Sequence, residues 1–187
     1  MTRIGRAAEL IGRPVITLDG GVAVGEIKDV LVDPQRSLVV CFTLRGRGRL
    51  ASPLVGILTS EAVRSIGRDA VMIGSAADVL AQREGLEAMV GEQQEVVGKE
   101  AITQGGASLG LVSDVLLELN GPWATVVGYE VDRRDGQRIL IPVAGGVSIS
   151  ADALVMPPDV EAHAANGLAG FRQALLRVRH ERMELGA

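Results

Sequence analysis

The chain has 187 residues, of which 47% are hydrophobic and only 2% aromatic, and its formal net charge is −4 at pH 7. The acidic balance argues against a dedicated nucleic-acid binder, and no stretch approaches the roughly 18 uninterrupted apolar residues of a membrane span. The first residues lack the apolar run of a signal peptide, and the single cysteine, Cys41, cannot form an internal disulfide. These features favour a cytoplasmic location and a core of branched aliphatic side chains in β-structure.

The first part of the chain predicts short strands separated by turns such as Asp19-Gly20. A longer connection, Thr59–Val63, is expected to form a short helical turn. The strands expected in this part are Pro14–Thr17, Gly25–Val32, Leu38–Leu44, Pro53–Ile57 and Ala70–Ile73.

A helical linker is expected next. Ser75 and Asp78 have the spacing of a capping box, which predicts a short helix that runs to about Glu84, where Gly85 weakens the pattern. The strands expected after this linker are Ala101–Thr103, Gly110–Glu118, Thr125–Val131, Ile139–Val143 and Ala153–Met156.

The C-terminal segment changes from strand to helix periodicity. Pro157-Pro158-Asp159 ends the β pattern, and apolar residues then recur at spacings of three and four, which places them on one face of an amphipathic helix. The best-defined part of this helix is Phe171–Glu184. The apolar positions are Ala164, Leu168, Phe171, Leu175 and Val178.

The two strand-rich parts repeat each other. Leu10–Thr17 matches Val96–Thr103, and Gly25–Val32 matches Gly110–Leu117. A repeat of this length indicates a duplicated domain rather than a solenoid. Because each copy alone buries a marginal core, the copies are expected to dock on each other or on the flanking helices. The expected organisation is a first copy over residues 8–74, a helical linker over 75–94, a second copy over 95–157 and a helical extension over 158–187.

Each copy opens on a hydrophobic pair, a glycine and a basic residue, in Leu10–Arg13 and Val96–Lys99. A Gly-x-hydrophobic-x-Asp-hydrophobic strand follows in Gly25–Val30 and Gly110–Val115. These motifs, with the closing segment Val63–Val71, resemble the PRC-barrel family. That family includes the cytoplasmic domain of the photosynthetic reaction-centre H subunit and the C-terminal domain of a bacterial ribosome maturation factor. The resemblance implies a mainly β protein with two tandem small antiparallel barrels, no known catalytic residues and docking to protein partners.

Chemistry at single residues is sparse in this sequence. Asp29 and Asp114 are the matched polar pair, but one carboxylate per copy cannot build a cation cage of about six oxygens. We expect them to accept hydrogen bonds from backbone N–H groups. Gly46–Ala51 has the outline of a dinucleotide-binding turn, but Pro53 opposes the helix that such a turn requires. No catalytic, cofactor-binding or metal-binding residues are predicted, and the protein is expected not to be an enzyme.

The candidate partner-binding residues fall into three groups. Arginines in the central connection of each copy present two basic tips that suit phosphates of RNA or anionic lipid. Trp123 follows a turn and either anchors a partner or folds back over the end of a barrel. The C-terminal helix covers a barrel, pairs with another copy or meets a membrane surface. The candidates are Arg45, Arg47, Arg49, Trp123, Arg133, Arg134, Arg138, Phe171 and Leu175.

These observations favour a non-enzymatic protein-interaction or assembly module, with a protein partner that the sequence does not name. A homodimer and a peripheral contact with a membrane remain open at this point. The first alternative is an RNA- or ribosome-assembly module that uses the arginine-rich turns. The second is small-molecule sensing in a cleft between the two copies.

Overall fold

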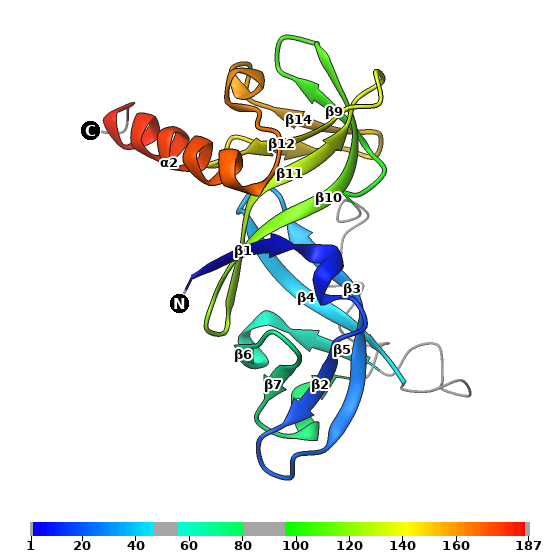
Figure 1. Cartoon of the computed structure of the whole chain (residues 1–187). Helices are drawn as coiled ribbons and strands as arrows, with labels where there is room; N and C mark the ends of the chain where they lie inside the picture. The colour runs from blue at the N-terminus through cyan, green and yellow to red at the C-terminus, as the bar shows by residue number, and fades with distance from the viewer. Residues whose placement is uncertain (1, 47–55, 81–95, 186–187) are drawn as a thin grey trace.

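The computed structural model describes residues 2–46, 56–80 and 96–185. It is mainly β, with one long helix near the C-terminus (Figure 1). The elements of the first half are β1 (Arg3–Arg6), η1 (Ala7–Leu10), β2 (Pro14–Thr17), β3 (Ala23–Asp33), β4 (Leu38–Arg45), β5 (Gly56–Thr59), η2 (Ser60–Ala62), β6 (Val63–Ile66), β7 (Val71–Ile73), η3 (Ala76–Asp78) and β8 (Val79–Leu80). Those of the second half are β9 (Glu100–Thr103), β10 (Ser108–Asn120), β11 (Trp123–Asp132), β12 (Arg138–Pro142), β13 (Ser148–Ile149), β14 (Ala153–Met156), η4 (Val160–His163) and α2 (Leu168–Leu185).

The described strands form one continuous 14-stranded sheet in the order β13-β14-β9-β10-β11-β4-β3-β2-β7-β6, with β1, β12, β5 and β8 paired off this path. The two halves join where Thr125 of β11 pairs with Leu38 of β4, and the amide of Val126 donates to the carbonyl of Ser37 at 2.9 Å. This sheet is not closed, so the expectation of two separate barrels is not confirmed.

The repeat predicted from the sequence reappears in the strand registers. Asp29 pairs with Thr43 between β3 and β4, and Asp114 pairs with Glu130 between β10 and β11. Register shifts lie at matching places before and after these pairs. Each half also contains one parallel pair, β2 with β7 in the first and β9 with β14 in the second. A bulge re-aims the side chains beyond it, so its repetition means that the two halves direct equivalent residues to equivalent faces.

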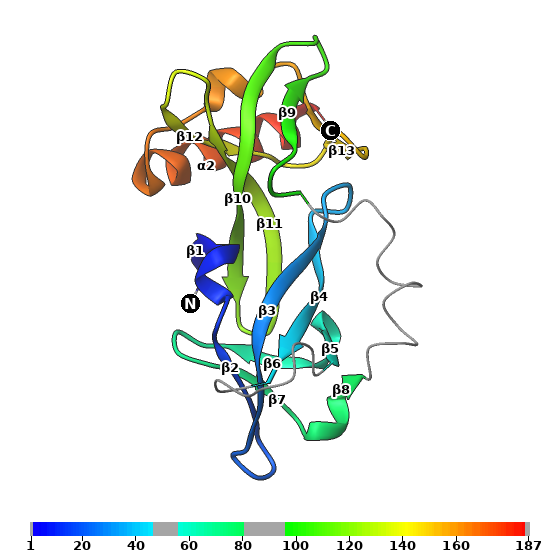
Figure 2. The same ribbon diagram turned by 90° about the vertical axis from the view of Figure 1, so that its right-hand side faces the viewer.

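The N-terminal strand β1 was not predicted, and it belongs to the sheet of the second half (Figure 2). It pairs with β10 in antiparallel register from Arg3 opposite Leu119 to Arg6 opposite Leu116. The chain then passes through η1, which lies against both β10 and β3, and enters β2 of the first half. The first residues therefore tie the two halves together.

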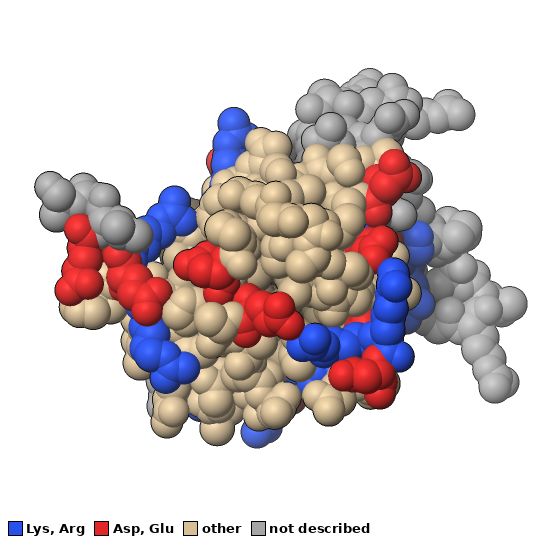
Figure 3. All heavy atoms as spheres, turned by 90° about the horizontal axis from the view of Figure 1, so that it is seen from above, with Lys and Arg blue, Asp and Glu red and all other residues tan. Residues whose placement is uncertain are grey.

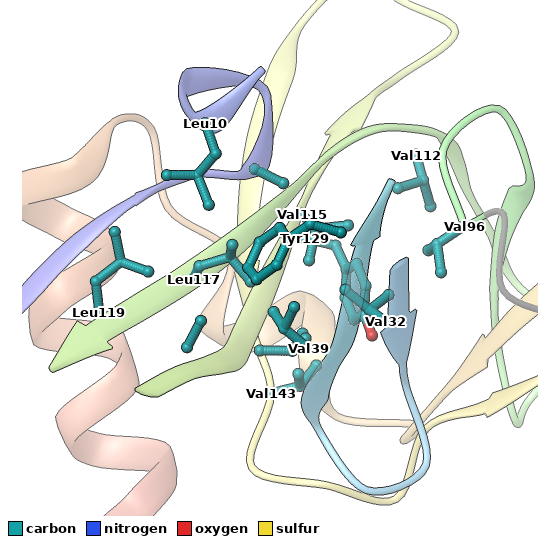
Figure 4. Close-up of a cluster of buried hydrophobic side chains, with 14 of the residues drawn as sticks. Leu10, Val32, Val39, Val96, Val112, Val115, Leu117, Leu119, Tyr129 and Val143 are labelled. Carbon is teal, nitrogen blue, oxygen red and sulfur yellow. The ribbon is translucent and has the colours of Figure 1, made fainter. Parts of the chain in front are cut away.

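One hydrophobic cluster runs through both halves. Figure 4 shows Val32 and Val39 of the first half beside Val115 and Tyr129 of the second. The cluster is mostly valine, leucine and isoleucine, as the low aromatic content predicts. A half-chain of this size supplies only a marginal core, and sharing one cluster lets each half stabilise the other.

The predicted linker helix is wrong over Val79 and Leu80. Ser75 and Asp78 do form a capping box, with the Asp78 carboxylate accepting the amides of Gly74 at 2.8 Å and Ser75 at 3.0 Å, but it caps only the short turn η3. The chain then extends as β8 because it pairs with the edge of β5. The remainder of that prediction lies outside the described residues.

Other predicted elements differ in their bounds. Residues 53–55 of the predicted strand Pro53–Ile57 lie outside the described part of the chain, and β5 runs from Gly56 to Thr59. The expected helical turn is present as η2. The short strands β6 and β13, which pair with β7 and β14, were not predicted.

Helix α2 covers one face of the second half (Figure 1). Its residues Phe171 and Leu175 are buried against Leu116, Val127 and Leu140, as the predicted apolar face requires. Two further apolar residues of the helix, Leu176 and Met183, are exposed. Apolar side chains are therefore not confined to the buried face, and the amphipathic character expected from the sequence is not confirmed.

Candidate functional site

The basic residue of each opening motif donates a hydrogen bond to the closing turn of the same half. Arg13 donates from Nη1 to the carbonyl of Gly67, and Lys99 donates from Nζ to the carbonyl of Ala151 at 2.5 Å. The second half keeps this contact although Ser150 and Ala151 replace Gly67 and Arg68, because the acceptor is a backbone oxygen. These contacts indicate that the basic residue of each motif has a structural role.

The motif aspartates also make scaffold contacts. Asp114 is buried and accepts the amide of Val115 at 2.7 Å and that of Ala8 at 3.2 Å, which holds η1 on the second half. Asp29 is more exposed and accepts the hydroxyl of Thr43 at 2.8 Å. The predicted backbone hydrogen bonds are thus present at Asp114, whereas the described contacts of Asp29 are to side chains.

Burial raises the pKa of the Asp114 carboxyl, and the negative charge of Glu130 adds to this, while amide hydrogen bonds oppose it. A carboxyl with a raised folded-state pKa stabilises the fold at low pH and loses that contribution as the pH rises through the folded pKa. In urea unfolding over a pH series, Asp114→Asn should therefore gain stability relative to wild type as the pH rises above 3.8, the ordinary value.

Asp132 provides the matched control. Its pKa is lowered, mainly by a hydrogen bond from Arg138, so Asp132→Asn should lose stability relative to wild type as the pH rises through the lowered pKa toward 3.8, below the window of Asp114. If the two variants follow parallel pH profiles, the assigned environments of these carboxylates are wrong.

A buried ion-pair network lies beside Asp114. The Glu130 side chain is 3% exposed, and its Oε2 lies 2.6 Å from Nη2 of Arg6 in β1. Its Oε1 lies 3.3 Å from Nη1 of Arg138 in β12. Neither Glu130 nor Arg6 was predicted, because no local pattern reports that residues so far apart in the chain meet.

The predicted basic tips are neutralised by acidic neighbours. Arg45 lies 2.6 Å from Glu26, and in the second half Arg133, Arg134 and Arg138 lie 3.2, 3.2 and 2.6 Å from Glu161, Glu100 and Asp132. Figure 3 shows basic and acidic side chains next to one another on the upper face rather than in a basic patch. Arg47 and Arg49 lie outside the described residues.

Trp123 and Leu38 form an exposed apolar pair at the seam between the halves, which we call the seam patch. Trp123 is 63% exposed and Leu38 is 47% exposed. Leu38 pairs directly with Thr125, and Trp123 lies two residues before Thr125 on the same face of β11, within reach across the strands. The hairpin turn before Trp123 is fastened to β6, since the amide of Ile66 donates to the carbonyl of Gly121 at 3.0 Å.

Phe171 and Leu175 do not lie on the surface. Both are buried beneath α2, where the absent side chain of Gly128 leaves room for the Phe171 ring. Burial withdraws these two residues from the candidate partner-binding set. Of the predicted partner-binding residues, Trp123 is the exposed one that the structure places near the seam. Leu38, which was predicted only as part of a strand, lies beside it.

Two searches over the described residues bear on other kinds of site. Among those residues, His, Cys, Asp and Glu side chains form no group of three that could hold a metal ion. Within the same part of the chain, no helix has the length and apolar character needed to cross a membrane.

Comparison with known proteins places the chain in a family. The PRC-barrel domain model matches residues 4–80 and again residues 92–163, which together make up more than half of the sequence. The chain therefore belongs to the PRC-barrel domain family and contains two copies of the domain. A search of curated proteins finds no match to this sequence.

Proposed function

We propose that the protein is a non-enzymatic interaction module that docks and helps to assemble a protein partner. In this proposal each PRC copy is a small barrel-type unit, left open where it joins the other. The module would act in the cytoplasm, and the partner that it docks there could lie at the membrane surface.

The seam patch is the observation that carries this proposal. Tryptophan is enriched at binding hot spots because its large ring gains much from burial against a partner. Trp123 exposes most of its surface on a strand whose neighbours are fixed by backbone pairing, so little ordering would be needed on binding. A rigid apolar anchor of this kind suits a protein surface.

The ion pairs favour a protein over RNA as the partner. An arginine that already faces a carboxylate must give up that contact before it neutralises a phosphate, and the counterion-release gain per arginine falls accordingly. Each arginine tip residue in the described part of the chain has such a carboxylate within 3.2 Å.

Trp123→Ala is expected to weaken partner binding at least tenfold, the range of a hot-spot residue. Affinity capture from a native extract would identify a stoichiometric partner of the wild type, and titration with the purified partner would measure the loss. Leu176→Ala is the matched control, since Leu176 is an equally exposed apolar residue, 66% exposed, that belongs to α2 and is not part of the seam patch. Equal binding by wild type and Trp123→Ala would contradict the proposal, as would salt-sensitive RNA as the recovered component.

A further inference from the structure

A cavity of about 230 Å³ lies in the second half, between the β12–β13 loop, the segment after β14 and the last turns of α2. Its polar lining comes from three separate stretches of chain. The loop contributes Gly145 and Gly146, the segment after β14 contributes Asp159 and His163, and α2 contributes Glu181 and Arg182. The cavity is distinct from the seam patch.

The part of the cavity lining around Arg182 is suited to a carboxylate. Gly145 and Gly146 both have positive φ angles, 99° and 73°, and the Arg182 guanidinium lies against Gly145 so closely that a Cβ there would collide with it. Among the described residues, no acidic side chain lies at ion-pair distance from Arg182. Arg179 on the same helix differs, since its Nη2 lies 2.9 Å from Oε2 of Glu118. A guanidinium can donate two parallel hydrogen bonds to a planar carboxylate, and Gly145 has no side chain to obstruct it.

The other polar groups are suited to an ammonium. Glu181 and Asp159 supply carboxylates, and Oε2 of Glu181 lies 3.3 Å from Nε2 of His163, whose side chain is only 16% exposed. Two carboxylates and one guanidinium line the cavity, so a simple anion has less to gain there than a ligand that carries both charges.

The remaining wall is apolar. Val143, Val160 and Val178 line the cavity together with two prolines. Val143 and Val160 are core residues, 4% and 5% exposed, and Val178 is half-buried, so the apolar surface that they offer to an aliphatic group is small. The size suits a molecule with a few side-chain carbons.

We propose that this cavity binds a small zwitterion, an α-amino acid with an aliphatic side chain. Arg182 holds the carboxylate, Glu181 and Asp159 hold the ammonium, and the valines receive the side chain. The proposal does not depend on the interaction function, because the residues involved are separate.

Calorimetric titration of the full chain with L-valine tests this site. The expected result is saturable one-to-one binding, weakened at least tenfold in Arg182→Met. Arg177→Met is the control, because Arg177 is an exposed residue of the same helix that does not line the cavity. Circular dichroism melting of each variant establishes that α2 remains folded.

Two analogues separate the ends of the ligand. Isobutyrate lacks the ammonium and isobutylamine lacks the carboxylate, so each is expected to bind at least tenfold more weakly than valine. Absence of binding by valine and leucine, or unchanged binding in Arg182→Met, would overturn the proposal. Isobutyrate that binds as tightly as valine would overturn the zwitterion assignment.

Discussion

Gly128→Ala should lower the free energy of unfolding by about 3 kcal/mol, the upper part of the range for overpacking a filled site. A Cβ at this position would collide with the carbonyl oxygen of Ile141 and lie 2.7 Å from Cε2 of Phe171. The first obstacle is backbone, and the second is an aromatic ring that is fully buried. Neither can move without opening the contact between α2 and the second half.

The effect is expected to be local to α2 as well as global. Urea unfolding measures the stability, and amide hydrogen exchange should show reduced protection in Leu168–Leu185. Cys41 is the register-equivalent residue, since it faces Leu31 as Gly128 faces Leu116. Cys41→Ala removes only a sulfur and should cost much less. A change below about 0.5 kcal/mol in Gly128→Ala would contradict this account of how α2 is seated.

Arg6→Met should lower the free energy of unfolding by about 2 kcal/mol, because it removes one of the two arginines that pair with the buried Glu130 carboxylate. Arg6 itself is 32% exposed, which limits the loss. The substitution removes the guanidinium in a shorter, uncharged side chain and leaves the buried Glu130 carboxylate with Arg138 alone, at 3.3 Å. It also removes the contact that fixes the end of β1 to the second half. Urea unfolding of the full chain measures the loss.

Two further variants sharpen this test. The double variant Arg6→Met with Glu130→Gln removes the buried charge that has lost one of its two arginine partners, and it should recover part of the lost stability. Arg36→Met breaks an exposed pair, in which the arginine side chain is 80% exposed, and should cost less than about 1 kcal/mol. Equal losses in Arg6→Met and Arg36→Met would show that the buried Glu130 carboxylate does not depend on Arg6.

Strand positions were predictable because they follow local patterns. Alternating apolar residues and Asn-Gly or Asp-Gly turns located β2, β3, β10 and β14, and the repeated motif predicted a common register. β1 gave no such signal, since Ile4 is the only large apolar residue in Arg3–Arg6. Its stability comes from pairing with a strand more than a hundred residues away, which no local window contains.

The candidate site was predictable only in part, because some of its residues meet only through pairing of distant segments. Trp123 stood out as the single tryptophan beside a turn, but its neighbour Leu38 joined it only through the pairing of β4 with β11. The arginine clusters were visible in the sequence, whereas their carboxylate partners came largely from other segments, as Glu161 does for Arg133. Phe171 showed the opposite case, because a residue that was predicted to bind a partner is buried beneath α2.

Binding at the seam patch can be observed directly through Trp123, because the chain contains one tryptophan. Incorporation of 5-fluorotryptophan gives a single fluorine resonance that a partner lacking the label cannot obscure. Addition of the captured partner is expected to shift or broaden this resonance in proportion to complex formed, as the ring leaves water. An unchanged resonance in a sample whose mass establishes the complex would contradict the account.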